Sequence, residues 1–249
     1  MSLPTVTAPT YELKLQSLNK PIKYRPYLVK EEKLLLMAQE GGDEVEIEQT
    51  MKDIIHVCTF GVIDPDTLPS FDLELLFLHL RAKSVNNIIE LQYECKNVPT
   101  RQATTVVEGD DGVCHNKETI KIDLDTIKIV VPPDHTKKIM ITEKLGCTMR
   151  YPTNKHIQVF KESGSADSVA MIADCIESIF DVSGEIHETK DVKPEEVVTF
   201  VESLSLQQIS KFRQFFETLP HLEHKFQFAC IKCGYTEDIV LAGLLDFFA

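Results

Sequence analysis

The segment FQFACIKCGYTEDIVL, at residues 226–241, constrains the local fold more tightly than any other stretch of this chain. Apolar and polar residues alternate on both sides of a short turn, which predicts two antiparallel strands. Cys230 and Cys233 lie at the corners of that turn, and Gly234 follows at once. The spacing is typical of a metal knuckle, of a redox pair, or of a tight turn that carries two thiols. A thioredoxin-like redox pair would open a helix rather than join two strands, so the redox interpretation is the weakest of the three.

A second pair of cysteines in the middle of the chain has a similar design. The strand-like segment IELQYEC ends at Cys95, and the next alternating segment begins at Cys114, with 18 residues between the two thiols. A closed structural zinc site takes four ligands, and each hairpin supplies two. The candidate zinc ligands are Cys95, Cys114, Cys230 and Cys233. The spare candidates are His115, His221 and His224. The alternative is two unrelated turns that contain thiols.

Charge and hydropathy argue against a nucleic-acid-binding protein and against a membrane protein. The formal net charge is −13, which repels the phosphate backbone of nucleic acids over most of the surface. Residues 14–30 form the one basic stretch, and its alternating pattern favours an ordinary strand with solvated lysines. The longest apolar runs are far shorter than the roughly 20 residues of a membrane span. No secretory signal precedes them, so we expect a cytosolic protein whose seven cysteines are reduced.

The first third of the chain predicts a hairpin followed by helices. TYELKLQSL and IKYRPYLV alternate around a turn at Asn19, Lys20 and Pro21. Helical spacing follows from Lys30, again after the glycine pair at 41–42, and from Asp72 to about Val85.

The middle of the chain predicts an antiparallel sheet, from strands at 88–95 and 118–131 and from extended chain after residue 136. On the second strand, Asp123 and Asp125 are expected on the solvated face. Helical spacing returns at 166–180, where Cys175 is expected to pack in a core, and residues 181–196 are expected to be a polar connector.

The last quarter predicts two helices, the cysteine hairpin and a short apolar tail. Pro194 opens the first helix. The second carries an apolar stripe formed by Phe212, Phe215, Phe216 and Leu219. We expect the stripe to pack on the strand pair at 225–241, and the tail residues Leu244, Phe247 and Phe248 to close this core or to dock on a partner. The expected fold class is α+β, with parts at 1–87, 88–160, 161–193 and 194–249.

No catalytic motif is present in the sequence. There is no G-x-S-x-G elbow and no glycine-rich phosphate loop. The acidic stretch GDDG, at 109–112, lacks the ligand spacing of an EF-hand and is interpreted as a surface turn. We assign no catalytic residue, and a hydrolase that uses Cys and His is an alternative that the sequence leaves open.

Three segments carry a resemblance to a known family. In their order and residues, these segments resemble the T4-like bacteriophage baseplate hub and hub-assembly family. They are TYELKLQSLNKPIKYRPYLVKEEKLLLMA, LPSFDLELLFLHLRAKSV and ETIKIDLDTIKI. The C-terminal segment FACIKCG…GLLDFF is similar to that family too. The resemblance implies a late, non-enzymatic tail-assembly protein. It would act in the host cytoplasm or in the virion baseplate, together with other hub proteins and the tape-measure protein. A zinc-ribbon adaptor or nucleic-acid-binding module is the remaining alternative.

Overall fold

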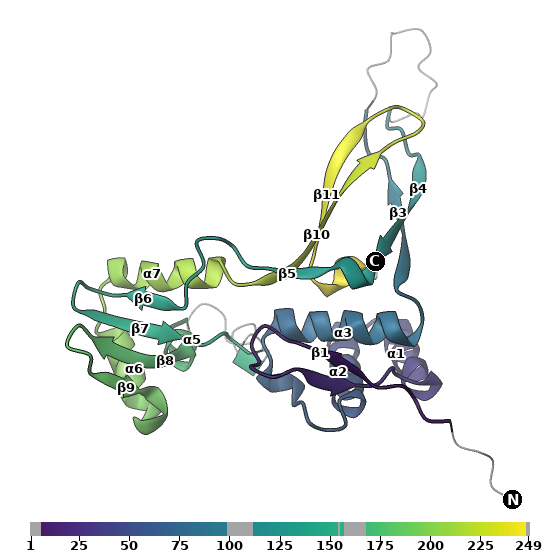
Figure 1. Cartoon of the computed structure of the whole chain (residues 1–249). Coiled ribbons are helices and arrows are strands. Elements are labelled where there is room, and N and C mark those ends of the chain that lie inside the picture. Colours follow the sequence, from purple (N-terminus) through teal and green to yellow (C-terminus); the bar gives the residue numbers. More distant parts are fainter. Residues whose placement is uncertain (1–5, 99–111, 154, 157–167, 248–249) are drawn as a thin grey trace, which may run out of the picture.

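The structure is a computed structural model of the 249-residue chain, and it describes residues 6–98, 112–153, 155–156 and 168–247. Helices and small antiparallel sheets make up the described part, which confirms the predicted α+β class. Figure 1 shows two bodies side by side, with an arm of paired strands that projects away from them. Phe248 and most of the GDDG stretch lie outside the described residues.

The first body is built from the N-terminal hairpin and three helices. Strands β1 (Tyr11–Leu13) and β2 (Ile22–Tyr24) pair antiparallel, which confirms the predicted hairpin, although each strand has only three residues. Helices α1 (Val29–Gly41), α2 (Glu44–Cys58) and α3 (Ser70–Ser84) follow, with a short 3-10 turn at Pro65–Thr67 before α3. All three helices were expected from the apolar spacing.

Helix α3 is the centre of the first core. Its sequence is apolar on nearly every face, which is typical of a helix with neighbours all round it. Leu76, Phe77, Leu78 and Leu80 are at most 2% exposed. The Asp72 carboxylate, which is also fully buried, accepts the backbone N–H groups of Gln16 and Ser17 at 2.8 and 2.7 Å. The connection between β1 and β2 is therefore held directly on the first turn of α3.

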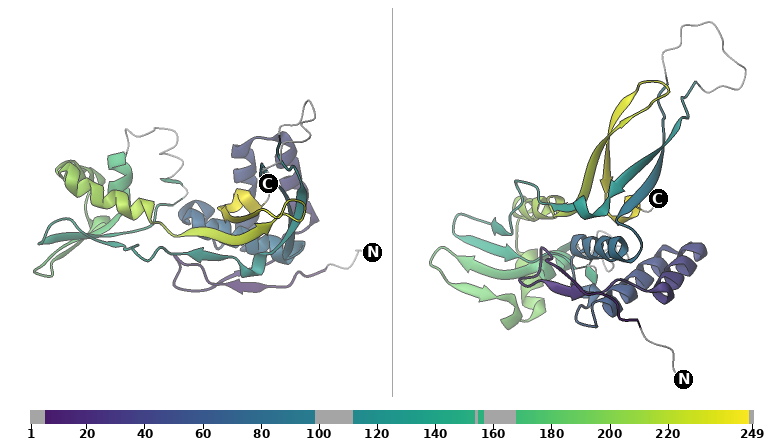
Figure 2. Two further views of the ribbon diagram at one scale, coloured as in Figure 1. Left: turned by 90° about the horizontal axis from the view of Figure 1, so that it is seen from above. Right: turned by 45° about the vertical axis from the view of Figure 1, so that its right-hand side comes forward.

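Two hairpins form the arm. Strand β3 (Ile88–Glu94) pairs with β4 (Lys117–Asp123), and β10 (His221–Ala229) pairs with β11 (Thr236–Ala242). The start of β10 also pairs with β5 (Lys128–Val130), so β10 runs from the bodies into the arm (Figure 1). The right-hand view of Figure 2 shows both hairpins rising together to one end.

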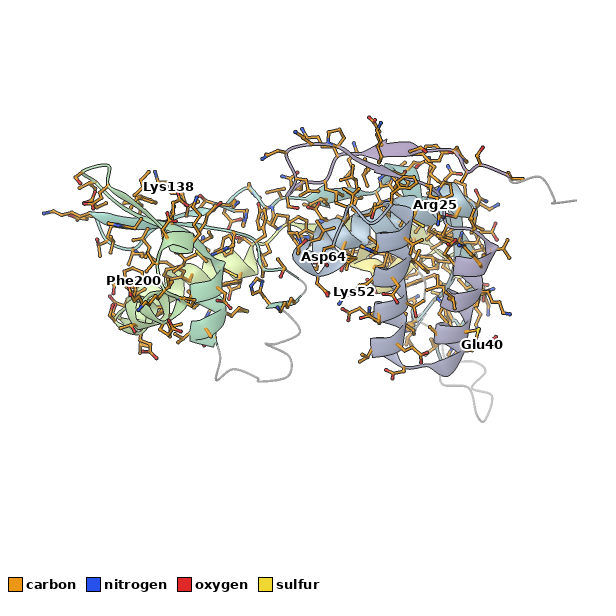
Figure 3. The ribbon with its side chains drawn as sticks, turned by 90° about the horizontal axis from the view of Figure 1, so that it is seen from below. Arg25, Glu40, Lys52, Asp64, Lys138 and Phe200 are labelled. Atoms are coloured by element: carbon orange, nitrogen blue, oxygen red, sulfur yellow. The ribbon has the colours of Figure 1, made fainter. Side chains whose placement is uncertain are left out.

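The second body is a four-stranded antiparallel sheet with helices packed on it. The strand order is β6 (Lys138–Met140), β7 (Leu145–Met149), β8 (Ile176–Asp181) and β9 (Ile186–Glu188). Helices α5 (Ser168–Cys175), α6 (Pro194–Glu202) and α7 (Leu206–Glu217) contribute to its core, and Pro194 is the first-turn proline of α6 as predicted. Figure 3 shows Lys138 and Phe200 in this body and Arg25, Lys52 and Asp64 in the other.

The prediction of one helix at 166–180 is wrong in its C-terminal third. Helix α5 ends at Cys175 and strand β8 begins at Ile176. Strand β8 pairs with β7 on one side and with β9 on the other, and β9 lies within the stretch expected to be a connector. Hydrogen bonds to strands on both sides outweigh the helical spacing, which is a weak preference by comparison.

The predicted strand at 118–131 is also interrupted. A 3-10 turn at Leu124–Thr126 separates β4 from β5, and the Asp123 side chain caps it by accepting the N–H of Asp125. Asp125 is exposed, as predicted, and its carboxylate accepts from Lys83 Nζ at 2.9 Å. The turn lets the chain leave the arm and enter the strand pair between the bodies.

The C-terminal quarter contributes to both bodies. Phe212 and Phe215 are buried in the second core, so the expectation that the stripe packs on residues 225–241 is wrong. Leu244 and Phe247, in a 3-10 turn at Leu244–Phe247, are buried in the first core beside α3 residues. Pro220, just before the start of β10, lies between the segment that packs in the second core and the segment that packs in the first. The domain boundaries after residues 87, 160 and 193 stay a prediction.

Candidate metal centre

Each hairpin of the arm carries a pair of cysteines beyond the ends of its paired strands. In the first hairpin, the N–H of Cys95 donates to the carbonyl of Asn116 at 2.8 Å, and the N–H of Cys114 donates to the carbonyl of Asn97 at 2.9 Å. The ladder of β3 and β4 thus continues past their ends. The backbone brings Cys95 and Cys114 together despite the long link between them.

The second hairpin closes with a tight knuckle. The N–H of Gly234 donates to the carbonyl of Cys230 at 2.9 Å, and the N–H of Cys230 donates to the carbonyl of Tyr235 at 2.8 Å. Gly234 has a φ of +72°, a left-handed conformation that costs glycine little. The glycine therefore serves the turn that points both thiols to the same side.

The four sulfur atoms converge. The Sγ atoms of Cys95, Cys114, Cys230 and Cys233 all lie within 4.8 Å of one another. Two of the separations join the hairpins, Cys95 to Cys233 at 3.7 Å and Cys114 to Cys230 at 3.8 Å. A tetrahedral zinc ion with Zn–S bonds of about 2.3 Å spaces its sulfurs by about 3.8 Å. A disulfide needs about 2.0 Å, so the spacing suits a shared metal ion and not a sulfur–sulfur bond.

Burial and aromatic packing shield the cluster. Cys95, Cys114 and Cys230 are buried, and Cys233 is partly exposed. Phe228 is the other buried member of this small core, and its ring centroid lies 4.6 Å from that of Tyr93 on the other hairpin. Ile120, Phe226 and Ile239, which are partly buried, complete this small core.

Polar side chains around the sulfurs fix the two turns relative to each other. The Nδ2 atoms of Asn97 and Asn116 donate to the sulfurs of Cys233 and Cys230 at 3.7 and 3.6 Å. The Glu118 carboxylate accepts from Asn116 Nδ2 at 2.9 Å and from the backbone N–H of Ile231 at 2.7 Å. Glu118 therefore ties the first hairpin to the knuckle of the second. Hydrogen bonds to the ligands of a metal ion, and to their neighbours, orient those ligands.

The thiols of the cluster differ in their electrostatic environment. The backbone amide of Tyr235 lowers the pKa of the Cys233 thiol to about 7. Burial raises the pKa of the Cys95 thiol to about 12 and also raises the pKa of Cys114.

The spare histidines have other partners. His115 pairs with Glu94, and His221 Nδ1 lies 3.2 Å from the carbonyl oxygen of Leu219. The His224 ring lies 6.2 Å from that of Phe226. Within the described residues, the four cysteines are the one group of three or more candidate ligand atoms, and it includes none of these histidines.

The remaining thiols are core residues. Cys58, Cys147 and Cys175 are fully buried, as expected for Cys175, and burial raises their pKa values to about 11, 12 and 12. A thiol with so high a pKa is a poor nucleophile at neutral pH.

Sequence reasoning selected the four cysteines but missed Asn97, Asn116 and Glu118. The polar residues beside each cysteine were the available signal. Their roles depend on which residues of two distant hairpins lie opposite each other, and no local pattern contains that information.

The chain was also compared with known proteins. It matches the family described as T4 bacteriophage base plate protein over residues 8–249, nearly its whole length. The chain therefore belongs to the T4 bacteriophage base plate protein family. No curated protein and no solved structure gave a significant match. Among the described residues, no helix is both long and apolar enough to cross a membrane.

Proposed function

We propose that this baseplate protein acts without catalysis in the assembly of the baseplate hub, by binding other hub and tail proteins such as the tape-measure protein. We further propose that a zinc ion, bound by Cys95, Cys114, Cys230 and Cys233, holds its arm in shape. The closed set of four converging sulfurs carries the zinc proposal, and the family match over residues 8–249 supports the assembly role. Four protein thiolates fill a tetrahedral zinc ion and leave no position for water or substrate, which is the arrangement of structural sites.

The arm needs a cross-link of this kind. An isolated two-stranded hairpin is at best marginally stable in water, and the cluster of Phe228 and the thiols is small. A zinc ion would join residues that are 138 positions apart, Cys95 and Cys233, and its binding free energy would become folding free energy. A rigid arm presents the same surface to every partner, which is what an assembly protein requires.

The chemistry of the other thiols supports the non-enzymatic assignment. Cys58, Cys147 and Cys175 are buried with raised pKa values. A hydrolase that uses Cys and His needs an accessible thiolate beside a histidine. Two of the converging thiols, Cys233 and Cys230, instead accept hydrogen bonds from asparagine side chains.

Two measurements test the proposal. Protein purified without chelators should contain about one zinc ion per chain by elemental analysis. The Cys230→Ser and Cys95→Ser variants should lose the ion, whereas Cys147→Ala, which removes a buried thiol from another core, should retain it. In the second measurement, the chain is co-expressed with the neighbouring tail proteins and the complex is identified by mass spectrometry.

The outcomes separate the two proposals. Tail proteins that co-purify with metal-free protein would refute the zinc site and leave the assembly role standing. Zinc-loaded protein that captures no tail protein would refute the assembly role and leave the site standing. A DNA affinity that falls steeply with added salt would favour the nucleic-acid-binding alternative over the assembly role.

A further inference from the structure

A groove lies between the N-terminal hairpin and the residues that follow α2, and none of its lining residues belongs to the cysteine cluster. The backbone N–H of Arg25, after β2, donates to the carbonyl of Cys58 at 2.9 Å and joins the two elements. The groove has a volume of about 940 Å³. Its apolar lining, which defines the Phe60 groove, consists of Leu18, Pro21, Ile22, Phe60, Val62 and Ile63.

Phe60 is held in an unfavourable conformation at this groove. Its φ is +58°, in the left-handed region that bulky residues rarely adopt, and 55% of the residue is exposed. Val62, two residues on, is 77% exposed. Folding gains little from an exposed aromatic ring at a position that glycine or asparagine would occupy more easily. Strained backbone of this kind is concentrated at binding sites.

Hydrogen bonds hold the segment in this position. The N–H groups of Gly61 and Val62 donate to the carbonyls of His56 and Thr59 at 2.9 and 3.1 Å. On the far side, His56 Nδ1 lies 2.8 Å from the carbonyl oxygen of Ile63. Phe60 and Val62 therefore project from an ordered turn, and a partner would lose little conformational entropy by binding them.

The charge at the groove is opposite to that of the chain. Two lysines, Lys20 and Lys23, are the charged residues of its lining, and no acidic residue lines it, although the chain has 39 acidic and 26 basic residues. Lys23 lies 3.7 Å from Glu12, but both side chains are at least 60% exposed, so the pair is weak. Lys20 has no acidic partner within the described residues. An apolar floor with a basic rim complements an apolar segment that carries acidic residues.

We propose that the Phe60 groove docks an acidic segment of another baseplate protein, with the apolar side chains of that segment against Phe60 and Val62. This inference rests on the proposed assembly role and is independent of zinc. A nucleic acid is a poorer occupant, because two lysines provide few phosphate contacts on a chain with a net charge of −13.

Site-specific photo-cross-linking identifies the occupant. The full-length chain with Phe60→p-benzoylphenylalanine is co-expressed with the neighbouring tail proteins, irradiated and analysed by mass spectrometry. We expect a cross-link to a peptide of another tail protein in which acidic residues flank apolar ones. A cross-link to a basic peptide, or to a second copy of this chain, would overturn the proposal.

Point variants provide the second test. Phe60→Asn removes the ring and suits the left-handed conformation, so the protein should fold and keep its zinc content. Capture of the cross-linked partner should fall roughly tenfold or more, as expected for the loss of a central aromatic anchor. Lys20→Glu combined with Lys23→Glu should also weaken capture. Leu206→Gln changes a residue that is 89% exposed on the second body and should have no effect.

The outcomes distinguish failure of the groove proposal from failure of the proposed assembly role. Unchanged capture by a folded Phe60→Asn protein refutes the groove while the assembly role stands. If the unmodified chain captures no tail protein at all and no cross-link forms, the assembly role and the groove both fail.

Discussion

The Sγ atom of Cys114 lies 3.8 Å from the Sγ atom of Cys230, although the two residues are 116 positions apart in the chain. Each belongs to a different hairpin, and Glu118 bridges the same two hairpins through Asn116 and the backbone of Ile231. The four sulfurs and this carboxylate therefore form one unit, which can be tested one residue at a time.

The first prediction concerns Glu118, which touches no sulfur. In the zinc-loaded protein, Glu118→Ala should weaken zinc affinity by roughly tenfold or more, because Asn116 and the knuckle lose their common acceptor. Competition with a coloured chelator measures the affinity. Glu237→Gln is the matched control, since Glu237 lies on the same arm and, among the described residues, accepts from the Tyr93 hydroxyl at 3.0 Å and not from the cysteine turns. Equal affinities for Glu118→Ala and the unmodified chain would show that the carboxylate does not position the ligands.

Asp72 should be a major stabiliser of the first body. Asp72→Asn replaces one acceptor oxygen by an amide group that faces a backbone N–H, and it also removes a charge-assisted hydrogen bond. We expect the free energy of unfolding to fall by about 1.5–3 kcal/mol, measured by urea denaturation. Asp43→Asn is the control, because Asp and Asn cap a helix about equally and Asp43 caps α2. A change no larger than that of the control would contradict the role of Asp72.

A side chain at Gly146 in β7 should collide with the side chains of Phe180 and Met140. A Cβ atom there would lie 2.4 Å from Cζ of Phe180 and 2.9 Å from Sδ of Met140. Gly146→Ala should therefore lower stability by roughly 1–3 kcal/mol, and Phe180→Leu should restore part of the loss in the double variant. Gly41→Ala is the comparison, since its Cβ would meet only Glu46 at 3.6 Å. Additive losses in the double variant would show that the predicted clash with Phe180 is absent.

Glu74 on α3 should make stability depend on pH. Burial raises the pKa of its carboxyl to about 7, and His221 partly opposes that shift. A raised folded-state pKa favours the native state at low pH, and this contribution is lost as the pH rises through about 7. Glu74→Gln should therefore be more stable than the unmodified chain at pH 8.5, by roughly 2–3 kcal/mol at most, and the difference should shrink towards pH 5.

Thermal melts across this pH range measure the effect. The exposed carboxylate of Glu177 provides a control, and Glu177→Gln should show no such trend. A Glu74→Gln protein that gains nothing at high pH would mean that Glu74 is well solvated.

The apolar tail should be needed for folding of the first body. Phe247 is 1% exposed and Leu244 is 7% exposed within the core around α3. Phe247→Ala should destabilise the protein by about 3–5 kcal/mol. Deleting residues 244–249 should lower the melting temperature and reduce assembly. A truncated protein that melts normally and assembles normally would refute both expectations, and one that folds but loses a partner would place the tail in an interface.

The parts of the fold that the sequence predicted are local ones. The three N-terminal helices follow from apolar spacing within each segment, and the cysteine hairpin follows from alternation around CIKCG. The pairing of Cys95 with Cys114 was predictable because each cysteine stands at the end of a strand-like segment. The family, too, is readable from the sequence, and the match over residues 8–249 confirms it.

The parts that failed depend on distant partners. The residues of strand β8 have helical spacing, but the strand pairs with β7 on one side and with β9 on the other. Phe212 and Phe226 are only 14 residues apart in the sequence. Phe212 nevertheless packs in the second core, whereas Phe226 packs against the small core of the arm. A periodic pattern shows that a face is apolar and does not show which neighbour covers it.

The separation of the cysteines along the chain also sets the order in which the two pairs of sulfur ligands are synthesised. Cys95 and Cys114 leave the ribosome well before Cys230, which follows Cys114 by 116 residues. At about 5–20 residues per second, the first hairpin waits roughly 6–23 s with only half of its sulfur ligands. Phe247, which completes the core around α3, is made later still. Both the arm and the first body are therefore completed only after the residues of the second core, which lie between Cys114 and Cys230, have been made.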